Sequence, residues 1–319
     1  MGGFLTLDMI RKEYAFGSTT GLADIFIRSW APADSSKVKA IFQIAHGMAE
    51  HGERYEDFAK YLVAEGYAVF ANDHIGHGKS VATDDDLGYF GERDGWLAFV
   101  NDTKLLTDLA KNEYPDKPVI LFGHSMGSFI ARSYAEKFGG DLAGAVFCGT
   151  SGTNPAAGVA IKLADVIAKI KGSRHRSEFI NKVAFGAFNK RIEKVRTPYD
   201  WLSRDEAQVD KYIADDYCGF LFTAVGYRDM SAVLHSVSSK SWYTNLPFVL
   251  PMLLIAGKMD PVGNYGKGIE QVFRDLKATG HKNVTMKLYD DDRHEILNEL
   301  DKEVVYKDVA DWADKVLAG

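Results

Sequence analysis

Hydrophobic and polar positions along this chain follow two different periods, and the periods divide it into strands and helices. Short, mostly apolar runs recur through the first half and return near the end, as is typical of strands buried on both faces. These runs lie at Val38–Ala45, Tyr67–Ala71, Pro118–Phe122, Ala143–Cys148, Pro251–Ala256 and Val284–Tyr289. Segments with apolar residues at helical spacing separate them. The alternation predicts parallel strands joined by crossover helices, in a doubly wound α/β sheet.

The beginning and the middle of the chain depart from this alternation. Near the start, Tyr14–Phe16 and Ala23–Ile27 flank a loop rich in glycine, serine and threonine, which predicts an antiparallel hairpin. Residues 151–240 show helical periodicity without a convincing strand. Five apolar residues there fall on one helical face: Val159, Leu163, Val166, Ile167 and Ile170. We therefore expect a core formed by residues 1–150 and 241–319, with residues 151–240 inserted as a helical cap, or lid.

Charge distinguishes the inserted segment from the rest of the chain. Between Ser151 and Asp200 there are ten Lys and Arg residues against four Asp and Glu, a local charge of +6 in a chain of net charge −6. The negative total argues against nucleic acid as the main partner. Two interpretations of the insertion stay open. It is either a solvated helical subdomain with incidental charge, or a cap that makes transient contact with anionic lipid surfaces.

Composition adds few further restrictions. The chain has 319 residues, 46% of them hydrophobic and 26% charged, as expected of an ordinary globular protein. Cys148 and Cys218 lie among apolar or aromatic residues, so we expect free thiols rather than a disulfide. No basic segment followed by an apolar run opens the chain, which favours a cytoplasmic protein. Gly2 with Thr6 fits the N-myristoylation pattern only formally.

The strand predicted at Pro118–Phe122 runs into Gly-His-Ser-Met-Gly at residues 123–127, and a helical pattern follows directly. A serine on so tight a turn takes a strained backbone conformation. Gly123 and Gly127 remove side chains where the strand and the helix crowd together. The turn would lift the Ser125 hydroxyl above the edge of the sheet. A loop with chance glycines is the simpler alternative, but the flanking strand and helix favour a nucleophile.

Acyl transfer also requires a base and a group that orients the base. Asp260 follows one predicted strand and His294 follows the next, and the carboxyl ends of parallel strands meet at one edge of the sheet. His294 would accept the proton of Ser125, and Asp260 would hold the tautomer of the imidazole. Taken singly, Asp260 could start a turn and His294 could begin a helix. The order Ser, Asp, His, with each residue after its own strand, favours the catalytic interpretation.

The oxyanion formed in acyl transfer requires two backbone N–H donors. Met126 begins the helix after the serine, so its N–H is free to stabilise negative charge. The second donor should come from the loop after an early strand, where we choose the N–H of Met48. Five histidines fall in the same half of the chain: His46, His51, His74, His77 and His124. Their spacings match no zinc motif, so we expect loop-stabilising hydrogen bonds rather than a metal site.

Together these stretches resemble α/β-hydrolases of the monoacylglycerol lipase and lysophospholipase group, also described as serine aminopeptidase-like. The matching stretches are His46–His51 with Arg54 and Tyr55, Asp73–Ser80, Gly123–Gly127, Asp260–Gly263 and Arg293–Glu299. The resemblance implies an α/β-hydrolase fold with a helical cap and no cofactor. It places the triad on Ser125, Asp260 and His294, and the oxyanion nitrogens on Met48 and Met126. Asp290–Asp292 stands where a Pro-Gly turn is expected.

The function predicted first is that of a serine carboxylic-ester hydrolase. Its substrate would be a small acyl ester such as a monoacylglycerol or a lysophospholipid. An aminopeptidase or amidase with the same triad is the second hypothesis, although only scattered acids such as Glu50 suggest an amine-binding pocket. A non-catalytic ligand-binding protein on this fold is the third, because fold alone does not establish activity. Such a protein would be expected to lose a triad member, and this sequence retains all three.

Overall fold

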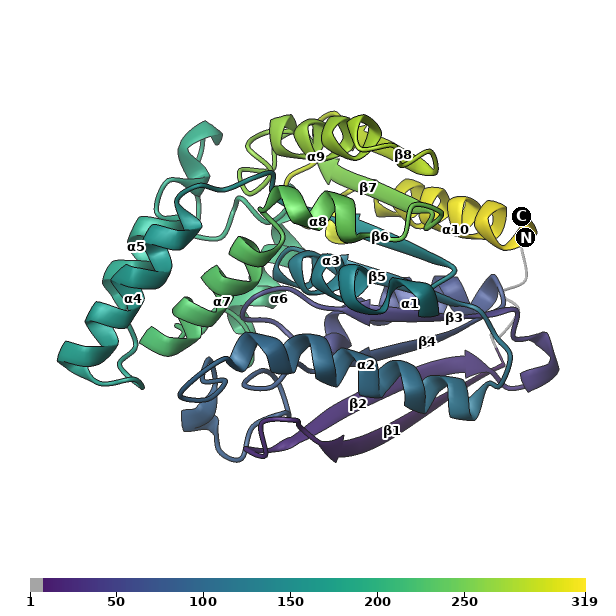
Figure 1. Ribbon diagram of the computed structural model, residues 1–319, viewed down its shortest axis with the longest axis horizontal. Coiled ribbons are helices and arrows are strands. Elements are labelled where there is room, and N and C mark those ends of the chain that lie inside the picture. Colours follow the sequence, from purple (N-terminus) through teal and green to yellow (C-terminus); the bar gives the residue numbers. More distant parts are fainter. Residues whose placement is uncertain (1–7) are drawn as a thin grey trace.

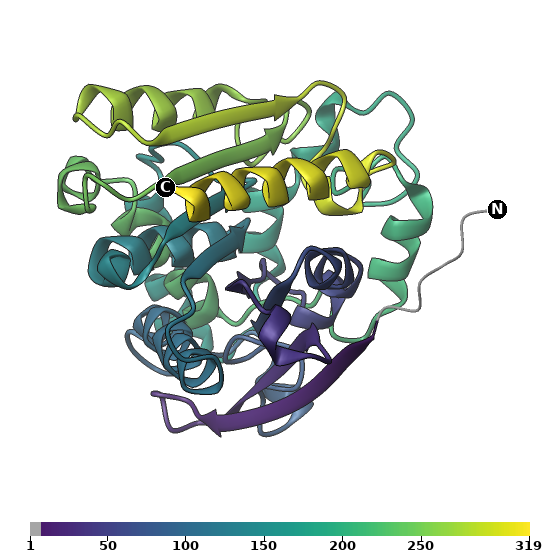
Figure 2. The ribbon, with the colours of Figure 1, turned by 90° about the vertical axis from the view of Figure 1, so that its right-hand side faces the viewer.

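The computed structural model describes residues 8–319, and in it eight strands form one sheet in the order β1-β2-β4-β3-β5-β6-β7-β8. The strands are β1 (Met9–Gly17), β2 (Asp24–Pro32), β3 (Ala40–Ala45), β4 (Tyr67–Asn72), β5 (Val119–His124), β6 (Gly144–Cys148), β7 (Met252–Gly257) and β8 (Val284–Tyr289). In this order, the strands from β4 through β3 to β8 pair in parallel. Strand β2 pairs antiparallel with both of its neighbours, β1 and β4. The edge strands β1 and β8 lie at opposite sides of the molecule (Figure 2). The predicted doubly wound sheet with an antiparallel start is confirmed.

Burial explains why the central strands were easy to predict. Every residue of β3, β4, β5, β6 and β7 is buried, since helices cover both faces of the sheet. Successive side chains point to opposite faces, so one strand contributes to both cores. In β3, Ile41 belongs to the core under one layer of helices, and Phe42 and Ile44 belong to the core on the other face. A continuous apolar run is the result of this two-sided burial.

The helices follow the predicted order. They are α1 (Glu56–Ala64), α2 (Gly95–Glu113), α3 (Met126–Phe138), α4 (Ala157–Lys171), α5 (Glu178–Phe185), α6 (Glu206–Ala214), α7 (Ala224–Ser236), α8 (Lys240–Asn245), α9 (Lys267–Ala278) and α10 (Lys302–Ala318). Helix α9 begins only at Lys267, because the residues before it cannot join a right-handed helix. Asn264, Tyr265 and Gly266 have φ angles of 49°, 58° and 86°, a left-handed conformation in which a right-handed helix cannot start.

Residues 151–240 hold α4, α5, α6 and α7, and no β-strand occurs within this part of the described chain. In Figure 1, α4, α5 and α7 lie on one side of the sheet, away from the end of α10. The apolar face predicted on α4 is largely exposed, with Val159, Val166 and Ile170 at 67%, 53% and 75%. Within residues 8–319, no helix combines the length and the apolar character needed to cross a membrane. Gly2 and Thr6 lie outside the described residues.

Candidate active site

Ser125 occupies the turn between β5 and α3. Its backbone has φ 53° and ψ −121°, a strained conformation for a residue with a side chain. The glycines at either side leave no room for a Cβ atom. A Cβ on Gly123 would lie 2.2 Å from the carbonyl oxygen of Gly127, and one on Gly127 would lie 2.1 Å from that of Ala45. The crowding expected from the sequence is therefore present, and the turn is possible only with glycine at both positions.

Asp260 and His294 follow β7 and β8 and meet at the same end of the sheet. His294 Nδ1 lies 3.0 Å from Asp260 Oδ1, and both side chains are almost fully buried. The same carboxylate oxygen accepts the N–H of Val262 at 2.8 Å, which fixes its position. Trp201, from the insertion, packs its ring 5.0 Å from that of His294. His294 and Ser125 line one cavity, so the fold brings the three predicted residues to one place.

Gly149, at the end of β6, lies against this pair and was not identified from the sequence. Its φ angle is 58°, in the left-handed region. A Cβ there would lie 3.1 Å from His294 Cε1 and 3.5 Å from Asp260 Oδ2. The only sequence signal for this contact was a glycine directly after a predicted strand. Glycine is common at such turns, so this signal did not single out Gly149.

Met48 and Met126 flank Ser125 from two different elements. Met48 lies in the loop after β3, Met126 is the first residue of α3, and both line the cavity. Gly47 brings the loop close, because a Cβ on Gly47 would lie 3.2 Å from the Cβ of Ser125. Among the described residues, no hydrogen bond uses the N–H of Met48 or of Met126. Both groups therefore remain free to bind an oxyanion.

A buried network of charges lies behind the loop that carries Met48. Arg54 donates to both carboxylate oxygens of Glu295, at 2.7 Å each, and also to Glu50. Glu50 in turn accepts from the N–H of Gly47 at 2.5 Å. Burial alone would raise the pKa of Glu50, but the charge of Arg54 together with the interactions of His124 and His46 outweighs burial and holds that pKa well below its usual range. The network joins the loops after β3 and β8.

His124 extends this network towards the catalytic side. Its Nδ1 lies 3.4 Å from Glu50 Oε1, and its Nε2 lies 3.3 Å from the carbonyl oxygen of His294. Burial lowers the pKa of His124. The hydrogen bond and the charge of Glu50, with the charge of Glu295, raise that pKa by a larger amount, so the net shift is upward. His124 thus links the carboxylate of Glu50 to the backbone of the residue proposed as the base.

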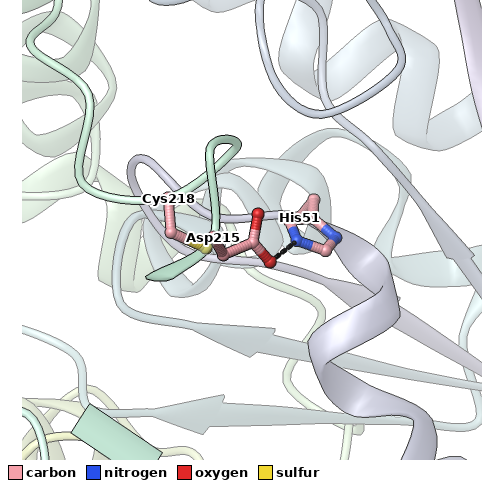
Figure 3. Close-up of side chains that lie close together, drawn as sticks. All are labelled: His51, Asp215 and Cys218. Atoms are coloured by element: carbon pink, nitrogen blue, oxygen red, sulfur yellow. Dashed lines mark hydrogen bonds and ion pairs between the residues drawn. The ribbon is translucent and has the colours of Figure 1, made fainter. Parts of the chain in front are cut away.

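Other histidines that the sequence analysis identified form hydrogen bonds within and between loops. The Nε2 atom of His46 accepts the N–H of His74 at 2.9 Å. Burial lowers the pKa of His74 to about 3 and that of His77 to about 4, so both rings are neutral near pH 7. His51 is different, because its Nε2 lies 2.9 Å from Asp215 Oδ2 in the insertion (Figure 3).

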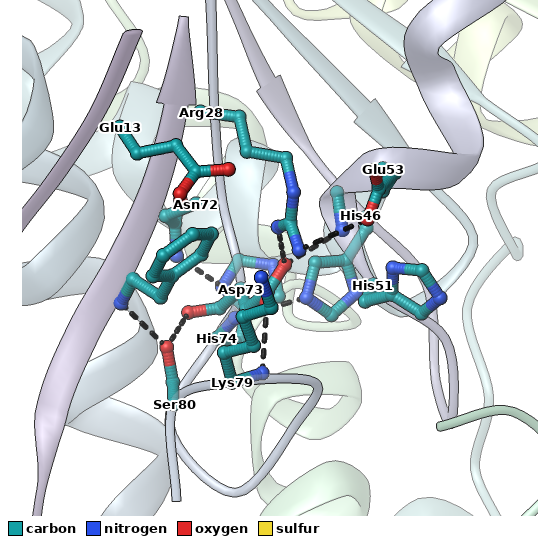
Figure 4. A network of polar contacts seen from close by, with 12 residues as sticks. Glu13, Arg28, His46, His51, Glu53, Asn72, Asp73, His74, Lys79 and Ser80 are labelled. Atoms are coloured by element: carbon teal, nitrogen blue, oxygen red, sulfur yellow. Dashed lines mark hydrogen bonds and ion pairs between the residues drawn. The ribbon is translucent and has the colours of Figure 1, made fainter. Parts of the chain in front are cut away.

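Asp73 stabilises the loops after β3 and β4 through a second set of hydrogen bonds (Figure 4). It is fully buried, and Arg28 donates to it at 2.7 Å. The backbone N–H groups of Gly52 and Lys79 donate to its two oxygens, at 2.9 Å each. Because Gly52 follows the loop of Met48, this carboxylate helps to fix the backbone that is proposed to bind the oxyanion.

The cavity between the sheet edge and the insertion has a volume of about 1250 Å³. Its lining combines the predicted site residues with mostly apolar side chains from the insertion. These include Leu163, Ile180, Val183, Phe185, Trp201, Phe220 and Leu234. A space of this size and character suits an elongated apolar group with one polar end.

Comparisons with known proteins agree with this geometry. Residues 36–301 match the family model described as serine aminopeptidase, S33. The chain is 28% identical over 307 residues to a monoacylglycerol lipase of Mycolicibacterium smegmatis, covering 95% of this chain and 96% of that protein. It is 29% identical over 283 residues to a monoglyceride lipase of Homo sapiens, covering 86% and 81%. A thermostable carboxyl esterase from Bacillus coagulans, solved with glycerol, superimposes with a TM-score of 0.90 at 30% identity, covering 96% and 99%.

Proposed function

Because the chain belongs to the serine aminopeptidase S33 family of α/β-hydrolases, we propose that it is a serine carboxylic-ester hydrolase acting through an acyl-Ser125 intermediate. The observation that carries this proposal is the contact of 3.0 Å between Asp260 and His294, which lines the same cavity as Ser125. A strained serine beside an oriented imidazole is the arrangement that nucleophilic acyl transfer requires.

In the proposed mechanism, Ser125 Oγ adds to the carbonyl carbon of the ester while His294 Nε2 accepts its proton. The N–H groups of Met48 and Met126 bind the oxyanion, and Asp260 stabilises the charged imidazole. Collapse of this intermediate breaks the ester C–O bond, and His294 returns the proton to the leaving alcohol. A water molecule, deprotonated by His294, then attacks the acyl-enzyme, and the carboxylic acid leaves as Ser125 regains its proton.

The proposed substrates are monoacylglycerols, lysophospholipids or comparable small acyl esters. The mostly apolar cavity of about 1250 Å³ supports a single acyl chain as the bound group. Relatives named as monoacylglycerol lipases, similar over almost the whole chain, support the same substrate class. An aminopeptidase would need a free carboxylate for the substrate amine. Glu50, which lines the cavity, is instead engaged by Arg54 and by the N–H of Gly47, and this favours esters.

We further propose that residues 151–240 act as a cap over this cavity and make transient contact with anionic membranes. Support comes from the exposed apolar side chains of α4 and α5, which include Phe179 at 60% and Val183 at 64%. Exposed lysines, among them Lys162, Lys169 and Lys182, accompany them on the same helices. Apolar residues beside lysines suit a surface that rests on lipid headgroups.

The test of the catalytic proposal is the Ser125→Ala variant. We expect it to fold normally and to lose about 10⁴-fold or more in kcat, because triad members act as a unit. A fluorophosphonate probe should label the wild type and not the variant. Ser133→Ala, two turns further along α3, is the matched control and should keep both activity and labelling. Full activity of Ser125→Ala would disprove the acyl-serine mechanism.

The substrate class requires a panel measured at matched concentration. Monoacylglycerols and lysophospholipids of several acyl lengths, p-nitrophenyl esters and aminoacyl anilides cover the three hypotheses. We expect hydrolysis of the esters and little or none of the anilides. A preference for anilides would favour the peptidase, and absence of any turnover with unlabelled Ser125 would favour a binding protein.

A further inference from the structure

A second group of potential ligand atoms lies where the insertion meets the core. His51 belongs to the loop after β3, whereas Asp215 and Cys218 follow α6 (Figure 3). A ring nitrogen of His51, a carboxylate oxygen of Asp215 and the Sγ atom of Cys218 all lie within 4.8 Å of one another. None of these three residues is among those that line the catalytic cavity. The cluster is therefore separate from the proposed ester site.

The types of ligand in this cluster are those that zinc prefers. Imidazole nitrogen, carboxylate oxygen and thiolate sulfur bind Zn²⁺ at about 2.0–2.3 Å in tetrahedral geometry. Such bonds separate the ligand atoms by roughly 3.2–3.8 Å. The pair His51 and Asp215, now 2.9 Å apart, would have to open by a few tenths of an ångström to admit the ion. A change of this size is within the reach of side-chain rotation.

The orientation of Asp215 favours this arrangement. Its Oδ1 atom accepts the N–H of Tyr217 at 2.9 Å, which leaves Oδ2 facing His51. One ligand oxygen is thus already held in position towards the imidazole.

Zinc binding would convert the Cys218 thiol to a thiolate, because cysteine binds the metal in its deprotonated form. The guanidinium of Arg54 is engaged by the carboxylates of Glu50 and Glu295.

We propose that His51, Asp215 and Cys218 bind one Zn²⁺ ion, with water as the fourth ligand, and that this ion ties the insertion to the loop carrying Met48. The partial exposure of Asp215 and Cys218 leaves the fourth position open to water. The same two segments already meet at Ala49, whose carbonyl oxygen accepts the N–H of Gly219 and the hydroxyl of Tyr212, at 3.0 Å each. The ion would fasten this junction and would take no part in ester hydrolysis.

The Cys218 thiol loses its proton to the solvent as the Zn–S bond forms. Titration of the metal-free protein with Co²⁺ should give sulfur-to-cobalt charge-transfer absorption in the near ultraviolet, and Zn²⁺ should displace the Co²⁺ with a stoichiometry of one.

Two pairs of variants make the test specific. Cys218→Ser should abolish the charge-transfer band, whereas Cys148→Ala, at the other free cysteine, should retain it. Asp215→Asn should weaken Zn²⁺ binding by more than about 100-fold, since loss of even an outer-shell partner weakens metal binding about 10–100-fold. Asp216→Asn, at the exposed neighbour, should leave the affinity unchanged. Circular dichroism checks that each variant is folded.

Wild-type protein that shows no charge-transfer band would overturn the proposal, whatever the variants do. Equal loss of affinity in Asp215→Asn and Asp216→Asn would also overturn it, because it would indicate nonspecific surface binding. The spectrum can be recorded on Ser125→Ala protein as well, so failure of the metal site and failure of the ester-hydrolase proposal give different results.

Discussion

Gly149 shows how strongly a single backbone position constrains the candidate site. Its φ of 58° is left-handed, and a Cβ at this position would press on the His294 ring at 3.1 Å. We expect Gly149→Ala to lower kcat by about 10–100-fold, because displacement of a catalytic group by about 1 Å can cost that much. KM should change little, since the acyl-binding part of the cavity is not altered. Steady-state kinetics with a p-nitrophenyl ester measure both constants.

Gly140→Ala is the matched control for this change. Gly140 does not have a left-handed φ, and a Cβ there would meet no atom within 4 Å. This variant should keep wild-type kinetics. If Gly149→Ala behaved like Gly140→Ala, the position of the His294 ring would not depend on that glycine.

At the scale of elements, α4 and α5 are helices whose apolar faces are only partly used inside the protein. Ile170 and Phe179 are 75% and 60% exposed. We expect the protein to bind anionic vesicles at low ionic strength and to dissociate as salt is added, because the Debye length falls from about 10 Å at 0.1 M to about 3 Å at 1 M. Vesicle sedimentation over a salt series measures this directly.

The apolar contribution to vesicle binding can be isolated by substitution. The double variant Ile170→Asp with Phe179→Asp should bind vesicles much more weakly than the wild type. Val249→Asp, which changes a residue 79% exposed outside the insertion, should bind normally. Absence of wild-type binding at every salt concentration would end the membrane proposal.

At the scale of the whole molecule, the insertion is held against the loop of His294 by a cluster of charges. Arg204 pairs with Glu299 at 2.9 Å, with Asp301 at 2.7 Å and with Asp292. Burial, with repulsion from Glu299 and Asp301, raises the pKa of Asp292 to about 7 against the opposing charge of Arg204. The loop that lacks the expected Pro-Gly turn thus contributes a buried acid to the contact between core and insertion.

This acid makes stability depend on pH. An unfolded aspartate titrates near pH 3.9, so between about pH 4 and pH 7 the folded protein binds more protons than the unfolded chain. The contribution of Asp292 to the free energy of unfolding therefore falls as pH rises through this window. We expect Asp292→Asn to be more stable relative to the wild type at pH 8 than at pH 5, by roughly 1–2 kcal/mol, since one pKa unit corresponds to about 1.4 kcal/mol.

Denaturant unfolding at the two pH values measures this difference. Asp290→Asn, at a neighbouring carboxylate that is 79% exposed, is the control and should leave the pH dependence unchanged. Parallel stability curves for Asp292→Asn and the wild type would show that Asp292 does not titrate in this window.

The sequence alone was sufficient for the order of strands and helices and for the loops of the candidate site. A parallel strand buried on both faces is mostly apolar along its length, so β3 to β7 appear as nearly continuous apolar runs. The tight turn at Ser125 admits only glycine at two fixed positions, which leaves a local pattern. The exact start of α9 could not be predicted, because left-handed φ angles at Asn264 and Tyr265 are not encoded by residue type in any obvious way.

Only the tertiary structure decided which distant polar groups meet. Arg54 and Glu295 are 241 residues apart, and His51 and Asp215 are 164 apart. Each residue taken alone resembles an ordinary surface charge or loop histidine. Their partners, their burial and the resulting pKa shifts depend on how the insertion packs against the sheet, and no local period or spacing specifies that packing. The contact of Gly149 with His294 has the same origin, since it joins the ends of two strands, β6 and β8, that β7 separates.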